Sequence, residues 1–164
     1  MKDILCALLS VAFLGTCTAE AQVVPPFYGN TAQEVALQVA EEMLSMNPSI
    51  EFGAFILCDE ALCWSTDFAI GGAASITGEE NLRIFPKTLP EIDQTVGYLH
   101  THPKQINKGF NSSYLVNELN KRPSFQDYLA TSFFAQEGNV NQPFNLWIVG
   151  PDEVLRSYPL PQPE

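Results

Sequence analysis

The two histidines of this chain lie two residues apart, in Gly97-Tyr-Leu-His-Thr-His-Pro103. The apolar run from Val96 to Leu99 predicts a buried strand, which Pro103 ends because proline lacks the N–H needed for a strand hydrogen bond. Residues i and i+2 of a strand point to the same face, so His100 and His102 are predicted to present both imidazoles to one side of a sheet. Two converging imidazoles on a rigid element supply half of the ligands of a zinc site.

Two acidic residues are candidates to complete such a site. A catalytic zinc takes three protein ligands and keeps a fourth position for water, whose pKa the metal lowers to about 7. Asp127 is a candidate because it lies at the start of a predicted helix after the strand, and Glu51 because it opens a strand expected in the same sheet. Each also has an ordinary interpretation. Glu51 alone is typical of an exposed strand, and Ser124-x-x-Asp127 is typical of a helix N-terminal cap.

Hydrophobic patterning predicts the elements that position these residues. A capping box and an apolar stripe predict a first amphipathic helix over residues 31–46, and a second is expected over 124–137, with Gly138 as its stop. Hairpins are predicted over 50–67 and 144–158, whereas residues 71–93 show only weak periodicity. The order of elements predicts an α+β fold, an α/β sandwich in which two main helices flank one mixed, largely antiparallel sheet.

Two cysteines flank the loop of the first predicted hairpin. Cys58 and Cys63 would face each other across Asp59-Glu-Ala-Leu62, close enough to form a disulfide in an oxidising compartment. An alternative combines these cysteines with the two histidines in a Cys2His2 structural zinc site, for which His-x-His is a poor spacing.

The N-terminal residues 1–21 are typical of a secretory signal peptide, with a short apolar stretch before the small-x-small sequence Ala19-Glu-Ala21. We therefore expect export to the periplasm or the exterior after cleavage near Ala21, and attachment as a lipoprotein at Cys17 is the weaker alternative. The apolar stretch is too short for a stable membrane span. The net charge of −11 argues against binding to nucleic acid or to an anionic membrane through a basic patch.

Taken in order, the candidate residues resemble the motif of the JAMM (JAB/MPN) zinc metalloprotease superfamily. That family carries a glutamate at the start of a strand after its first helix, then His-Ser/Thr-His-Pro, then Ser-x-x-Asp. The matching residues here are Glu51, His100-Thr-His-Pro103 and Ser124-Phe-Gln-Asp127. The two hairpins look most similar to a secreted bacterial branch of unknown function that occurs in polymorphic-toxin contexts.

The resemblance implies a role for each matched residue. His100, His102 and Asp127 would bind Zn²⁺, Glu51 would be the general base that takes a proton from the attacking water, and Ser124 would help to hold the oxyanion. The implied reaction is hydrolysis of an amide or isopeptide bond in a peptide substrate by an exported peptidase or amidase. From location alone, peptidoglycan stem peptides or proteins of a secreted competition system are the expected substrates.

The resemblance also implies a JAB/MPN-like single domain over residues 22–164, with a core at about 31–158 and a proline-rich tail at 159–164. The chain departs from the family in the polar segment 104–123, which is much longer than its counterpart and in which residues 112–120 are expected to form a short helix. Such an insertion could form a lid over the metal, or it could mean that Ser124 and Asp127 are not the true counterparts.

A second function is compatible with the same fold. Relatives that lack the motif serve as scaffolds, so this protein could be a non-catalytic exported binding module that neutralises a toxin or organises an envelope complex. Retention of every motif position favours the hydrolase, because a scaffold has no need of converging histidines and a glutamate. Zinc storage is a weaker option, since it would be expected to use more than two histidines.

Overall fold

The computed structural model describes residues 26–72, 76–104, 110–137 and 144–160. The elements are β1 (Tyr28–Gly29), α1 (Ala32–Met46), β2 (Phe52–Cys58), β3 (Cys63–Ser65), β4 (Ala69–Ile70), α2 (Gly78–Ile84), α3 (Leu89–Asp93), β5 (Thr95–Thr101), α4 (Phe110–Leu119), α5 (Phe125–Glu137), β6 (Asn145–Val149) and β7 (Leu155–Pro159). The predicted signal peptide and the helix stop at Gly138 lie outside the described residues. None of the helices described is long and apolar enough to cross a membrane.

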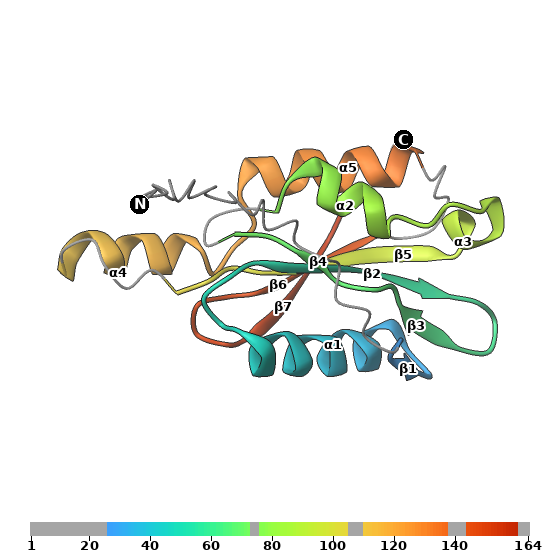
Figure 1. Ribbon diagram of the computed structural model, residues 1–164, viewed down its shortest axis with the longest axis horizontal. Coiled ribbons are helices and arrows are strands. Elements are labelled where there is room, and N and C mark those ends of the chain that lie inside the picture. The colour runs from blue at the N-terminus through green and yellow to red at the C-terminus, as the bar shows by residue number, and fades with distance from the viewer. Residues whose placement is uncertain (1–25, 73–75, 105–109, 138–143, 161–164) are drawn as a thin grey trace, which may run out of the picture.

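One sheet forms the middle layer of the molecule (Figure 1). Its strands follow the order β1-β3-β2-β5-β6-β7, with β4 also paired to β2. Every strand pair is antiparallel except β5 and β6, which run parallel. α1 covers one face, and α2 and α5 lie over the other. The predicted α+β class, with helices on both faces of one mixed and largely antiparallel sheet, is therefore confirmed.

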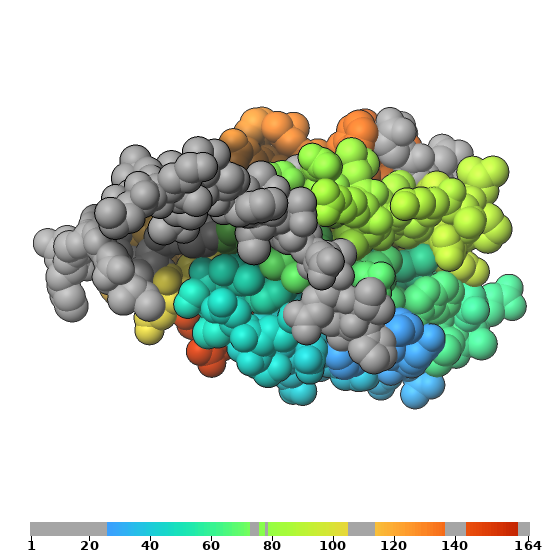
Figure 2. Space-filling view, viewed as in Figure 1, coloured from blue at the N-terminus to red at the C-terminus, as the bar shows by residue number. Residues whose placement is uncertain are grey.

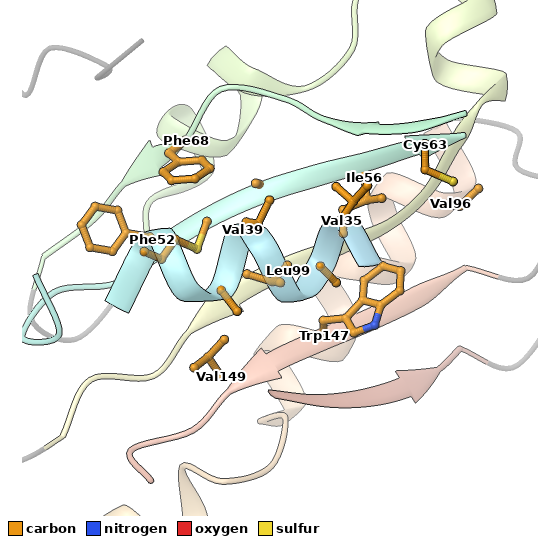
Figure 3. Packing of buried hydrophobic residues seen from close by; sticks show 14 residues of the cluster. Val35, Val39, Phe52, Ile56, Cys63, Phe68, Val96, Leu99, Trp147 and Val149 are labelled. Atoms are coloured by element: carbon orange, nitrogen blue, oxygen red, sulfur yellow. The ribbon is translucent and has the colours of Figure 1, made fainter. Parts of the chain in front are cut away.

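The first core lies between α1 and one face of the sheet (Figure 3). Val35, Val39 and Met43 recur at helical spacing and are fully buried, as the amphipathic pattern predicts. The sheet residues that they pack against include Phe52, Ile56, Leu99, Trp147 and Val149. Because these strand residues face α1, their neighbours along each strand face the opposite layer.

The second core is aromatic and anchors α5 to the opposite face. Phe134 of α5 packs edge-on against Phe55 of β2, with ring centroids 4.9 Å apart, and stacks on Phe85, 5.3 Å away. Tyr98 of β5 joins the cluster, 4.9 Å from Phe55. These contacts fix α5 over the end of β5, where the histidines lie.

The structure shows two short helices, α2 and α3, where the sequence pattern between residues 71 and 93 is weak. Thr77 caps α2 through a capping box, in which the Thr77 Oγ1 accepts from the Glu80 N–H and the Glu80 carboxylate accepts from the Thr77 N–H. This Thr-x-x-Glu signal is present in the sequence. In the space-filling view, α1 lies below and the α2–α3 segment lies at the upper right, with the β2–β3 hairpin between them at the right (Figure 2).

The predicted disulfide is confirmed. Cys58 and Cys63 lie opposite each other in the β2–β3 register and are bonded. The Asp59 carboxylate accepts the N–H groups of Ala61 and Leu62, both at 2.8 Å, and so holds the turn between them. The alternative Cys2His2 zinc site is wrong, because each cysteine has the other as its partner.

Candidate metal centre

The strand register places Glu51 beside the histidine pair. β2 and β5 run antiparallel with Gly53 opposite His100. Glu51 lies two residues before Gly53, and His102 lies two residues after His100, so each continues the face of its strand. Residues directly opposite in an antiparallel pair point to the same face, so the Glu51 carboxylate and both imidazoles lie on the α5 side of the sheet. They line one cavity of about 330 Å³.

Asp127 reaches both histidines from the first turn of α5. Its Oδ1 lies 3.6 Å from His100 Nε2, and its Oδ2 lies 3.5 Å from His102 Nε2. One ligand atom from each of the three residues lies within 4.8 Å of the others. Ligand atoms around a tetrahedral zinc, each 2.0–2.1 Å from the metal, lie about 3.4 Å apart. The three residues could therefore bind one metal ion with small side-chain adjustments.

The N-terminal cap of α5 fixes the Asp127 carboxylate. Ser124 Oγ accepts from the Asp127 N–H at 3.2 Å, and the Ser124 N–H donates to Asp127 Oδ2 at 2.5 Å. Burial opposes ionisation of Asp127, but its interactions with His102, His100 and Ser124 outweigh burial and hold its pKa well below the ordinary value. The capping and ligand interpretations of Ser124-x-x-Asp127 are therefore compatible, because one carboxylate makes both sets of contacts.

The His102 ring is held in one orientation. Its Nδ1 lies 2.7 Å from the Asn120 carbonyl oxygen, and a carbonyl can only accept, so Nδ1 carries a hydrogen. Burial lowers the pKa of His102, but the contacts with Asp127 and Asn120 outweigh burial and raise it above its ordinary value. The added proton sits on Nε2, beside Asp127 Oδ2. A metal cation bound between these two atoms would take the place of that proton.

The buried Nε2 of His100 indicates whether the site suits a metal ion. The residue is 5% exposed, and among the described residues its Nε2 is the one buried side-chain nitrogen or oxygen without a hydrogen-bond partner. Burial, reinforced by the charge of His102, lowers the pKa of His100 to about 3, so this imidazole is neutral. A buried polar atom without a partner costs about 1–3 kcal/mol. A cation bound by the neutral Nε2 would satisfy it, so the donor set fits a metal.

Glu51 has the acidity of a base that works near neutral pH. Burial raises its pKa to about 7, and the Asp127 charge adds to this effect, while the His102 charge and the Ile76 N–H oppose it. A carboxylate with this pKa is matched to accept and return a proton near pH 7. The same cavity is lined by all five candidate residues of the sequence, which are Glu51, His100, His102, Ser124 and Asp127.

The Glu51→Gln variant is expected to be more stable than the wild type at pH 8 and equally stable at pH 4, when both are metal-free. The raised pKa makes the proton on Glu51 contribute stability that is full below the ordinary value of 4.5 and lost as the pH rises through about 7. Because this side chain is only half-buried, we expect a gain of about 1–2 kcal/mol at pH 8. Urea unfolding in the presence of a chelator at both pH values measures it, with the exposed Glu60→Gln as control. An equal change in the free energy of unfolding at pH 4 and pH 8 in Glu51→Gln would contradict the raised pKa of Glu51.

Three further residues of the site were missed by sequence reasoning. Tyr98 shares a strand face with His100, stacks on its ring at 5.5 Å, and donates its hydroxyl to Asn81 Oδ1 at 2.6 Å. The i, i+2 spacing of Tyr98 and His100 could have indicated this contact. Gly53 leaves room for the tyrosine, because a Cβ there would lie 2.1 Å from the Tyr98 hydroxyl. Asn120 acts through its backbone carbonyl, which leaves no signal in the sequence.

The chain matches no protein-family model, no curated protein and no solved structure. The fold and the site therefore define its class by themselves. It is an α+β protein with a disulfide-locked hairpin and a buried His100, His102 and Asp127 group that could bind a metal ion.

Proposed function

We propose that this protein is an exported zinc-dependent hydrolase of amide or isopeptide bonds, with a JAMM-type site in a JAB/MPN-like domain. The observation that carries the proposal is the buried His100 Nε2, which lacks a hydrogen-bond partner among the described residues and lies beside an Asp127 carboxylate that also approaches His102. Two imidazoles and one carboxylate are a donor set that zinc accepts in catalytic sites.

Each residue of the site would have its own role in hydrolysis. When bound, zinc would supply a Lewis acid that polarises the substrate carbonyl and makes water more acidic. Glu51 would take a proton from the attacking water and return it to the leaving amine, and burial already raises its pKa to about 7 in the metal-free protein. The Ser124 oxygen already accepts from Asp127, so its hydroxyl hydrogen can be donated to the oxyanion.

The lining of the cavity supports an amide rather than an anionic substrate. Apart from the donor set and Glu51, its polar residues are neutral, namely Asn81, Tyr98, Asn120, Ser124, Gln126 and Thr131. No lysine or arginine lines it among the described residues. A phosphate group would meet the carboxylates of Glu51 and Asp127 without a compensating cation from the protein, whereas a neutral amide can bond to the amide and hydroxyl side chains.

The convergence of the site also favours the hydrolase over the non-catalytic binding module. A scaffold gains nothing from a buried imidazole nitrogen without a partner, which lowers stability. It also gains nothing from a half-buried glutamate whose ionisation the fold opposes. Sites that lower stability in this way are typical of catalysis.

The proposal is tested by metal content and hydrolysis together. The exported protein, exchanged into zinc buffer and desalted, is expected to hold about one zinc per chain. It should cleave members of a peptide panel that includes peptidoglycan stem peptides and isopeptide-linked peptides, as read by mass spectrometry. A chelator should stop cleavage and added zinc should restore it, while His100→Ala should lose both properties. Absence of stoichiometric zinc, or cleavage that survives chelation, would contradict the proposal.

A further inference from the structure

The turn that joins α4 to α5, residues 120–124, forms one wall of the metal centre. Its first carbonyl, on Asn120, is the acceptor for His102 Nδ1 at 2.7 Å. A metal-binding histidine depends on such a contact, because the acceptor fixes which nitrogen carries the hydrogen and which way the ring points. The position of one peptide group in this turn therefore determines how His102 Nε2 faces its partners.

The β6–β7 hairpin holds this turn in place. The Tyr158 hydroxyl donates to the carbonyl oxygen of Lys121, the residue after Asn120, at 3.2 Å. Gly150, the residue after β6, lies so close to the turn that a Cβ there would be 3.2 Å from Lys121 Cα. The Lys121 ammonium also lies 3.7 Å from Asp152, which is paired with Arg156 at 2.7 Å.

The same hairpin also fixes the backbone of His102. The His102 N–H donates to the carbonyl of Val149, the last residue of β6, at 2.8 Å. The hairpin thus holds His102 at its main chain directly and at its ring through the Asn120 carbonyl. The C-terminal part of segment 104–123, which the sequence predicts to be an insertion, therefore helps to hold His102 in place.

Of the contacts between the hairpin and the turn, the Tyr158 hydrogen bond is the one that holds the turn most firmly. The Lys121, Asp152 and Arg156 charges are each about 30% exposed, and ion pairs at such positions are screened by solvent. Tyr158 is half-buried and packs against the aromatic core, so its hydroxyl is held at a fixed place. Its acceptor belongs to the peptide unit next to the one that contacts His102.

We propose that Tyr158 is a positioning residue for the metal centre. By holding the Lys121 carbonyl, it fixes the neighbouring Asn120 carbonyl, keeps the hydrogen of His102 on Nδ1, and so raises the affinity of Nε2 for zinc. The proposal rests on the metal site of the proposed function and not on hydrolysis.

The test is Tyr158→Phe, which keeps the ring in the aromatic core and removes only the hydroxyl. We expect its zinc affinity to fall about 10-fold. Loss of a group that holds a metal ligand in place usually lowers metal affinity by about 10–100-fold, and Tyr158 acts at one step further from the ligand. Competition with a chromophoric chelator measures this affinity. Tyr28→Phe, at an exposed position on β1, is the matched control and should bind zinc as the wild type does.

A second measurement is independent of the metal. Because the chain has two histidines, the imidazole ¹H–¹⁵N signals of the metal-free protein can be assigned directly at alkaline pH. We expect His102 to show a hydrogen on Nδ1 that exchanges slowly with solvent, and to exchange it faster in Tyr158→Phe but not in Tyr28→Phe. Thermal unfolding of all three proteins identifies any general loosening of the fold.

The outcomes separate this proposal from the proposed function. Wild-type zinc affinity together with unchanged His102 exchange in Tyr158→Phe would overturn the positioning role and leave the metal site intact. If the wild type binds no zinc, the proposed function fails. Faster His102 exchange in Tyr158→Phe alone would then still support the positioning of the ring by Tyr158.

Discussion

Replacing Glu51 by glutamine is expected to lower the rate of hydrolysis by about 10²–10⁴-fold, which is the usual contribution of a general base. Zinc binding should be retained, because Glu51 is not one of the three grouped ligand residues. Glutamine has nearly the shape of glutamate and can still accept the Ile76 N–H, but it cannot take a proton from water. The loss is therefore expected in kcat, with zinc content close to that of the wild type.

The pH dependence of the wild-type rate provides the companion measurement. Glu51 must be ionised to act as a base, so the rate should rise with pH through its pKa. That pKa is about 7 without a metal, and a bound divalent cation would lower it by stabilising the carboxylate, so the acid limb of the profile is expected below pH 7. The exposed Glu60→Gln should leave rate and profile unchanged. Retained activity in Glu51→Gln, or loss of zinc and activity in parallel, would show that Glu51 is not the base.

Local sequence pattern was enough to predict the elements that carry the site. The alternation along β5 predicts that His100 and His102 share a face, and the Ser-x-x-Asp signal predicts a helix that starts with Asp127 in its first turn. Both predictions depend only on residues near one another in the chain. The predictions of export, of the substrate and of partners depend on features outside these elements and stay predictions.

The way in which these elements pack together could not be predicted from local sequence pattern. Glu51 and His102 line the same cavity because β2 pairs with β5, and this pairing joins strands that are distant in the sequence. The Asn120 contact with His102 uses a backbone carbonyl, which every residue possesses. α4 lies in a polar segment, and its Tyr114, Leu115 and Leu119 side chains are exposed. No pattern of buried residues therefore indicates where this helix begins and ends. These are the points at which tertiary packing, rather than sequence period, decides the site.

Asp127→Asn is expected to reduce zinc affinity by at least about 100-fold while keeping the cap of α5. Loss of an outer-shell partner already costs about 10–100-fold, and this variant loses the one charged ligand. Asparagine retains one oxygen that can accept the Ser124 N–H, so the start of the helix should survive. Without the negative charge, the pKa of His102 should also fall, because Asp127 is a main cause of its elevation.

Two companion variants separate the ligand role of Asp127 from its capping role. Ser124→Ala removes the side-chain cap of α5 and should lower stability by about 1 kcal/mol while zinc binding is retained. Asp127→Ala loses the ligand together with its half of the cap, so it should show both defects. Calorimetric zinc titration and thermal unfolding of the metal-free proteins measure the two effects. If Asp127→Asn binds zinc as tightly as the wild type, the carboxylate is only a cap, and the site is reduced to two histidines without a third ligand.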